Sequence, residues 1–264
     1  MKAITVVACT ACLLALGPCS YGQRFATLYN IADDFPVGLT QTGGVLYGAT
    51  DAGSGTGNCG TVFELLPPAL GGGSWTPVVL HSFIFGIGGP DGCVPLAAPL
   101  LGAGGVLHGV TSQGGVNSPP NFGTLYGVRP PAIPGGTWTE TVLYDFGTPG
   151  TNIDYPTSSL VKGPRGSFYV ASSTPNLCHL LPPASPGGAW TAKVIYSLRS
   201  PPPAIALNSL VAGPGGVLYG TSSGGPHLGE VVQFTPPADR GGAWTETLLH
   251  MFTGVGNQLA TPLR

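Results

Sequence analysis

Short apolar segments, separated by turns rich in glycine and proline, follow one another along almost the whole chain. Many of them place apolar residues on both faces of an extended strand, as in Val62-Phe63, Leu65-Leu66 and Val78-Val79-Leu80. A strand with one solvated face alternates apolar and polar residues, whereas a strand buried on both faces does not. No stretch after the N-terminal region shows the period of an amphipathic helix. The pattern predicts an all-β protein whose sheets are covered on both faces.

Four landmarks recur in the same order and divide the chain into four units. Each unit has a strand before a Gly-rich turn, an apolar–aromatic strand after it, a strand that ends at a Pro-Pro pair, and a last strand after a tryptophan. The tryptophan spacing is closer to the roughly 40–50-residue period of propeller blades than to the roughly 20–35 residues of most solenoids. We therefore predict a β-propeller-like array of four four-stranded units. The tryptophans are Trp75, Trp138, Trp190 and Trp244, and the units span about residues 36–83, 95–146, 156–198 and 207–252.

Both ends of this array carry a further piece of the repeat. Residues 25–31 resemble the last strand of a unit, which predicts an extra N-terminal strand. Residues 259–264 match residues 96–101, the first strand of the second unit, which predicts the start of a fifth unit at the C-terminus. Two interpretations are open: the chain is a piece of a longer repeat protein, or the two terminal strands help to close a small ring.

The N-terminal region predicts a signal peptide over residues 1–22. Lys2 precedes the apolar stretch from residue 4 to residue 16, and Ser20-Tyr21-Gly22 supplies the small residues of a cleavage site. The apolar stretch is shorter than the about 20 residues that a membrane-spanning helix needs, so we predict no transmembrane anchor. The repeat domain, residues 23–264, is then secreted, periplasmic or held at the cell surface.

Composition and charge narrow the possibilities further. The 44 glycines and 28 prolines would indicate disorder in a chain without a period, but 42% of the residues are hydrophobic and only 8% are charged. Disordered chains have the opposite balance, so this chain is expected to fold around a core. The formal net charge of −2 gives no basic surface, and nucleic acid is therefore not an expected partner.

Three cysteines follow the predicted signal peptide, in a compartment where disulfides form. Cys59 ends the loop between the second and third strands of the first unit, and Cys93 lies in the linker that leaves this unit. These two connections emerge on the same side of an antiparallel sheet, so we predict a Cys59–Cys93 disulfide. Cys178 occupies an apolar strand position and is predicted to be a buried thiol.

Several strings in the repeat resemble a known family. They are Leu-Tyr-Gly-x-Thr, Gly-Thr-Val-Phe-x-Leu, Pro-Pro-Ala-x-x-Gly-Gly-x-Trp-Thr-Glu-Thr and Val-Leu-Tyr-x-Phe, and they are similar to the GloVer-type tandem repeats of exported bacterial proteins. The third unit departs most, since Cys178-His179 replaces the Phe-Glu pair. The resemblance implies a propeller-like, surface-associated repeat protein, and it carries no catalytic residues that can be transferred.

The histidines give no catalytic or metal-binding motif in the sequence. His108 takes the repeat position of Tyr47, and His81 and His250 take that of Tyr144, so each is interpreted as a half-buried aromatic with a polar tip. His179 takes a polar exposed position, and His227 lies in a loop.

The carboxylate and hydroxyl side chains form no catalytic or metal-binding motif in the sequence either. Glu140 and Glu246 follow a tryptophan by two residues and are interpreted as solvated edge residues. Ser222 stands in a Gly-x-Ser-x-Gly string that lacks the helix a nucleophile elbow requires. We therefore predict no catalytic, metal-binding or cofactor-binding residues and no cofactor. The remaining acidic candidates lie in or beside turns, where aspartate bonds to the local backbone: Asp51, Asp91, Asp145 and Asp154.

The predicted function is that of an exported non-catalytic repeat protein, a binding or structural module whose partner is a glycan, a cell-wall polymer or another protein. The alternative is a propeller-fold hydrolase or lyase that acts on a glycan. Polar residues specific to one unit would favour the enzyme, and none stands out in the sequence. The tryptophans are interpreted as packing residues. Ligand contacts are expected on the variable loops, Asp51–Cys59, Ser112–Asn121, Ser172–Pro175 and Ser222–Gly229.

Overall fold

The fold was analysed in a computed structural model, which describes residues 2–6, 26–31, 34–53, 58–69, 73–84, 91–116, 122–133, 135–185, 187–198, 206–223, 228–239 and 241–253. The strands are β1 (Lys2–Val6), β2 (Ala26–Ile31), β3 (Asp34–Thr42), β4 (Val45–Gly53), β5 (Asn58–Leu66), β6 (Thr76–Ile84), β7 (Gly92–Pro95), β8 (Leu100–Leu101), β9 (Leu107–Gly114), β10 (Thr124–Arg129), β11 (Thr139–Asp145), β12 (Val161–Lys162), β13 (Phe168–Ser172), β14 (Asn176–Leu181), β15 (Thr191–Ser197), β16 (Ala206–Ala212), β17 (Leu218–Ser223), β18 (Gly229–Thr235) and β19 (Thr245–Phe252). The described helical segments are the 3-10 turns η1 (Ala103–Gly105), η2 (Pro164–Gly166) and η3 (Pro214–Gly216). None of the described helices has the length and apolar character needed to cross a membrane.

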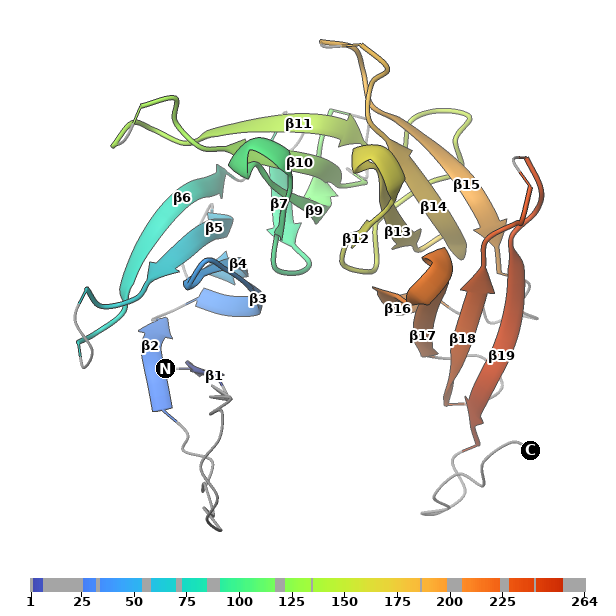
Figure 1. Cartoon of the computed structure of the whole chain (residues 1–264), viewed down its shortest axis with the longest axis horizontal. Helices are drawn as coiled ribbons and strands as arrows, with labels where there is room; N and C mark the ends of the chain where they lie inside the picture. Colours follow the sequence, from blue (N-terminus) through green and yellow to red (C-terminus); the bar gives the residue numbers. More distant parts are fainter. Residues whose placement is uncertain are drawn as a thin grey trace, which may run out of the picture.

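Four antiparallel sheets form the blades of a β-propeller and follow one another around an arc (Figure 1). Blade 1 contains β3–β6, blade 2 contains β8–β11, blade 3 contains β12–β15 and blade 4 contains β16–β19. We call the four strands of each blade a, b, c and d, in chain order. In blade 2 the additional strand β7 pairs with the b strand, β9, beside β8. The all-β, four-blade prediction is confirmed.

The turn between strands a and b has the same backbone geometry in each blade. Glycines with positive φ occupy it, for example Gly104 at 66° and Gly105 at 76°. These angles carry no steric cost for glycine, so the chain can reverse within a few residues. Blade 3 is the exception, because Arg165 takes the first of these positions at a φ of 54°.

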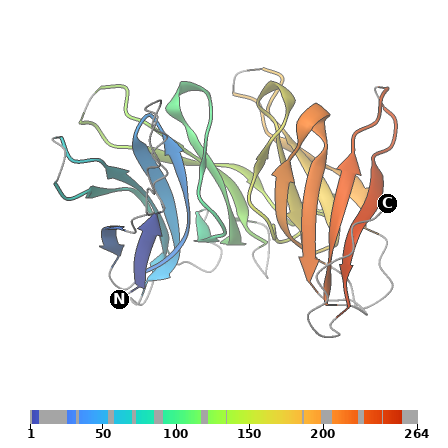
Figure 2. The ribbon, with the colours of Figure 1, turned by 60° about the horizontal axis from the view of Figure 1, so that its bottom comes forward.

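The connection between strands c and d is also built alike in each blade. A Pro-Pro pair ends strand c, because proline has no N–H to donate to the sheet. A glycine N–H then closes the turn in three blades, Gly136 to Ile133, Gly188 to Ser185 and Gly242 to Asp239. The a–b turns and the c–d connections lie at the same end of the sheets, the upper end in Figure 2.

The hydrophobic core lies between successive blades, which explains why the strands are apolar on both faces. One buried cluster joins blades 1 and 2 around Tyr126, a second joins blades 2 and 3 around Phe146, and a third joins blades 3 and 4 around Phe234. Every tryptophan is half-buried and packs against such a cluster, as the sequence analysis expected. Trp138, Trp190 and Trp244 each contact the cluster shared with the preceding blade, and Trp75 contacts one that includes Ile31 of β2.

The N-terminal region contributes the extra strand β2, which pairs with β1. Of the predicted signal peptide, residues 1–22, the described part is β1, and its cleavage stays a prediction. The predicted start of a fifth unit, residues 259–264, lies outside the described residues. Cys59 and Cys93, the pair expected from the sequence, are joined by a disulfide that links blade 1 to β7, and Cys178 is a buried free thiol.

Candidate functional site

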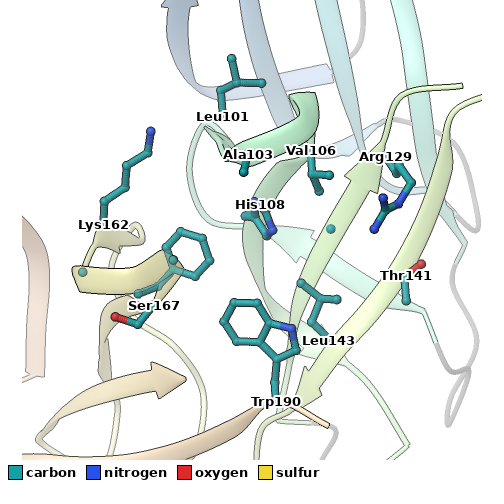
Figure 3. Close-up of a pocket in the computed structure, with 15 residues that line it drawn as sticks. Leu101, Ala103, Val106, His108, Arg129, Thr141, Leu143, Lys162, Ser167 and Trp190 are labelled. Atoms are coloured by element: carbon teal, nitrogen blue, oxygen red, sulfur yellow. The ribbon is translucent and has the colours of Figure 1, made fainter. Parts of the chain in front are cut away.

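A groove of about 610 Å³ lies between blades 2 and 3, and we call it the blade 2–3 groove. It opens at the end of the sheets that carries the a–b turns and the c–d connections, since η1, Gly166 and Trp190 line it. Its wall on the blade 2 side comes from β8 to β11, and its wall on the blade 3 side comes from β12, β13 and Trp190. The groove therefore lies in the seam between two blades (Figure 3).

The groove exists partly because one repeat position lacks a side chain. Gly127 of β10 pairs with His108, and the same position holds Glu64, His179 and Gln233 in the other blades. In blade 3 that side chain fills the space beside its neighbour, because His179 stacks on Tyr169 at a ring separation of 4.5 Å. In blade 2 the glycine leaves this space to the groove.

Aromatic rings line the groove where Trp190 meets its neighbours. Phe168 and Trp190 stack with a centroid distance of 5.7 Å and an interplanar angle of 9°. His108 of blade 2 lies 5.0 Å from the Phe168 ring and 6.3 Å from the Trp190 ring. Flat aromatic surfaces of this kind bind the apolar faces of ligands while leaving polar edges to other partners.

Two cations border the same groove. Arg129 ends β10 and Lys162 ends β12, and Figure 3 shows them on opposite sides of the groove, with His108 between them. Both side chains are exposed at its rim. In the other three blades, the residues equivalent to Arg129 and Lys162 are uncharged. The equivalents of Arg129 are Leu66, Leu181 and Thr235, and the equivalents of Lys162 are Gln41, Leu101 and Ala212.

His108 is neutral at physiological pH. Burial lowers its pKa from 6.5 to about 4, the backbone hydrogen bond with Val106 opposes this shift, and the charges of Lys162 and Arg129 add to it. Its Nδ1 atom is buried. With a pKa of about 4 the imidazole is neutral and a weak base. His108 is the candidate base of this site because it is the histidine among the fifteen residues that line the groove.

Ser167 and His179 form a serine–histidine pair next to the groove. Ser167 Oγ lies 2.8 Å from His179 Nε2, and it donates a hydrogen bond to the Pro164 carbonyl at 2.7 Å. Because its proton is used on Pro164, Ser167 accepts from the Nε2–H of His179 and is not activated as a nucleophile. Burial, followed by the charge of Lys193, lowers the pKa of His179 to about 4.

A second polar cluster lies at the junction of blades 1 and 2. His81, Asp91 and Glu140 each place one potential metal-binding atom in this cluster, and these three atoms lie within 4.8 Å of one another. Burial raises the pKa of Glu140 to about 7, the charge of Asp91 adds to the rise, and His81 opposes it. The expectation that Glu140 and Glu246 are solvated is wrong, because both side chains are half-buried between blades. These three residues come from separate segments of the sequence and were interpreted separately, so the cluster was not predicted.

The other residues considered in the sequence do not gather into a site in the described part of the chain. His250 packs edge-on against Phe252, and Ser222 is buried in β17. His227 lies outside the described residues, as do residues 54–57, 117–121 and 224–227 of the variable loops. The blade 2–3 groove opens at the end of the sheets opposite to those loops, where the sequence analysis expected only scaffold.

No family model matches this chain, and no curated protein matches it. Solved structures do match. A gluconolactonase from Xanthomonas campestris is 15% identical, with a TM-score of 0.50; the match covers 87% of this chain and 66% of that chain. This chain therefore spans just under two thirds of that protein's length. The native arabinanase of Bacillus subtilis is 15% identical over 83% of this chain and 81% of its own, with a TM-score of 0.42. At 15% identity and a TM-score of 0.50, the likeness to the gluconolactonase shows the propeller fold.

One function prediction is overturned by this comparison. The non-catalytic binding or structural module is wrong, because the solved propeller that matches at a TM-score of 0.50 is an enzyme, a gluconolactonase. The alternative prediction, a propeller-fold hydrolase, is the better supported of the two. The structure also supplies a feature that the sequence did not reveal, polar residues that each stand at an otherwise uncharged or apolar repeat position and line one groove: Arg129, Lys162 and Ser167.

Proposed function

We propose that this chain is an exported hydrolase that cleaves an ester or lactone bond in a sugar acid, and that it binds this substrate in the blade 2–3 groove. The observation that carries the proposal is the composition of the groove. An aromatic wall suits the apolar face of a sugar ring, and two cations suit a carboxylate or a developing oxyanion.

The residues of the groove favour an ester bond over a glycosidic bond. Glycoside hydrolysis uses two carboxyl groups on either side of the bond, and none of the fifteen residues that line the groove is Asp or Glu. Ester and lactone hydrolysis needs a base for the attacking water and positive charge near the carbonyl oxygen. His108 supplies the base in this proposal, and Arg129 and Lys162 supply the charge.

The Cys59–Cys93 disulfide supports the exported part of the proposal, because disulfides persist in oxidising compartments. Export also gives access to glycans and cell-wall polymers, the partners expected from the sequence.

The test is a substrate panel for the chain produced in an oxidising compartment. Sugar lactones and sugar-acid esters are assayed by proton release, beside nitrophenyl glycosides. We expect proton release from a lactone or ester above its spontaneous rate. His108→Gln should lower kcat at least about tenfold, and Arg129→Gln should raise KM by a similar factor.

Arg165→Gln is the matched control, since Arg165 is an exposed cation of η2 that does not line the groove. It should leave both constants unchanged. Cleavage of glycosides alone, or equal rates for the Arg129 variant and the original chain, would refute the proposed site.

A further inference from the structure

Three potential metal ligands from separate segments meet at the junction of blades 1 and 2. His81 lies near the end of β6, Asp91 stands directly before β7, and Glu140 lies near the start of β11. His81 Nε2 is 3.3 Å from Asp91 Oδ2. Ligands about 2.0–2.1 Å from a tetrahedral zinc ion are about 3.3–3.4 Å apart, so this spacing suits two ligands of one ion.

The equivalent junction of blades 3 and 4 shows what this position does without a metal. Glu246 occupies the repeat position of Glu140, and its side chain hydrogen-bonds to Tyr196, which occupies the position of His81. At the junction of blades 1 and 2, a histidine replaces the tyrosine and a second carboxylate, Asp91, joins the group. A hydroxyl donor is thereby exchanged for an imidazole nitrogen and an additional oxygen ligand.

One ligand atom of this group has no partner. Glu140 Oε1 is buried and has no hydrogen-bond donor among the described residues, and the same is true of Glu246 Oε2 at the junction of blades 3 and 4. Glu140 differs from Glu246 in having both a histidine and a second carboxylate, His81 and Asp91, beside it. An unpaired carboxylate oxygen in a buried junction costs free energy unless a proton donor or a cation meets it. Asp91 is oriented for this task, because its Oδ1 accepts a hydrogen bond from the Gly92 N–H at 2.9 Å, while Oδ2 faces His81. Outer contacts of this kind fix the direction of metal ligands.

From this geometry we propose that His81, Asp91 and Glu140 bind one divalent transition-metal ion of the zinc class, which bridges blades 1 and 2. One imidazole nitrogen and two carboxylate oxygens suit zinc, whereas calcium requires six to eight oxygen ligands. The ion lies near the Cys59–Cys93 disulfide, since Cys93 follows Asp91 by two residues, and both links brace the same pair of blades. The site is separate from the blade 2–3 groove: Glu140 faces blade 1, whereas the next residue, Thr141, lines the groove.

The experiment measures Zn²⁺ binding by titration calorimetry, on full-length mature protein without a histidine tag, after treatment with EDTA and dialysis. The original chain should bind one equivalent of Zn²⁺, should bind Mn²⁺ more weakly and Ca²⁺ least, and should unfold at a higher temperature with Zn²⁺. Glu140→Gln should weaken Zn²⁺ binding at least about tenfold and abolish the thermal shift.

Two further variants separate a metal site from a folding defect. His81→Tyr recreates the Glu–Tyr pair of the blade 3–4 junction, so it should fold normally and lose the metal. Glu246→Gln removes a half-buried carboxylate at the equivalent position and should bind Zn²⁺ as the original chain does. The proposal is overturned if the original chain shows no saturable Zn²⁺ binding, or if His81→Tyr binds Zn²⁺ with unchanged affinity. Neither readout depends on hydrolase activity.

Discussion

The substitution Gly127→Gln tests whether the blade 2–3 groove is where the chain binds its substrate. A Cβ at this position would lie 3.2 Å from Leu143 Cδ1 and 3.4 Å from Val106 Cγ1, which are the ends of flexible side chains that can shift by a few tenths of an ångström. Glutamine is already the residue of blade 4 here, where Gln233 pairs with Tyr219. Glycine within a strand costs roughly 0.5–1 kcal/mol relative to alanine. The variant should therefore fold, with a free energy of unfolding equal to that of the original chain or about 0.5 kcal/mol higher.

The same substitution should weaken substrate binding, because the new side chain projects into the space that the glycine leaves open. We expect KM for the lactone or ester to rise at least about tenfold, a loss of about 1.4 kcal/mol in binding free energy. Steady-state kinetics and urea unfolding on the same preparation measure both quantities. Gln233→Gly is the reverse change in blade 4: it should lower the free energy of unfolding by about 0.5–1 kcal/mol and leave KM unchanged. A folded Gly127→Gln protein with unaltered kinetics would show that the groove is not the site.

Three further predictions concern stability. His108 has a pKa of about 4 in the folded chain and 6.5 in the unfolded chain, so its contribution to the free energy of unfolding is complete above pH 6.5 and is lost as the pH falls toward 4. Between pH 7.5 and pH 4.5, urea unfolding should show that the original chain loses about 2 kcal/mol more of its free energy of unfolding than His108→Tyr does, and equal losses would contradict this. The Tyr144 hydroxyl is buried and has no hydrogen-bond partner among the described residues, and Ala192→Glu should give it an acceptor, as Glu246 does for Tyr196. The free energy of unfolding at pH 5 should rise by about 0.5–1 kcal/mol, and a lower value than that of the original chain would refute a hydrogen bond between the new carboxyl group and Tyr144. Removing the disulfide with Cys59→Ser and Cys93→Ser should lower the free energy of unfolding by about 4 kcal/mol, as expected for a sequence separation of 34 residues. A loss below about 1 kcal/mol in thermal unfolding would show that the disulfide does not stabilise the fold.

The four-blade fold could be predicted because its signals are local and repeated. Glycines that require positive φ mark each a–b turn, and the proline pair after β5 recurs at the end of every c strand. The tryptophans recur because Trp138, Trp190 and Trp244 fill the same space against the preceding blade, and Trp75 packs against a cluster that includes Ile31 of β2. The disulfide partners also followed from topology, since antiparallel strands place the two connections at one end of the sheet. Signals of this kind do not depend on which residues face each other across a seam.

The groove could not be predicted, because it depends on a side chain that is missing and on charges from two blades. Gly127 resembles any other strand glycine until its repeat position is compared with Glu64, His179 and Gln233. Arg129 and Lys162 are far apart in the sequence and meet only where blade 2 packs on blade 3. One signal was available: each is the charged residue at a repeat position that is otherwise uncharged.

The histidine at position 81 shows why reading the repeat one position at a time misleads. Its position holds tyrosine in blades 2 and 3, which made an aromatic packing role the simplest interpretation. At two junctions the structure brings this position next to the residue two places after the next tryptophan: ligand atoms of His81 and Glu140 lie within 4.8 Å of each other, and Tyr196 hydrogen-bonds to Glu246. At the junction of blades 2 and 3, Tyr144 and Ala192 belong to one apolar cluster, so the chemistry differs from junction to junction. In a protein whose core lies between its blades, the unit that determines chemistry is the junction of two repeats, and each substitution has to be interpreted together with the residue across that junction.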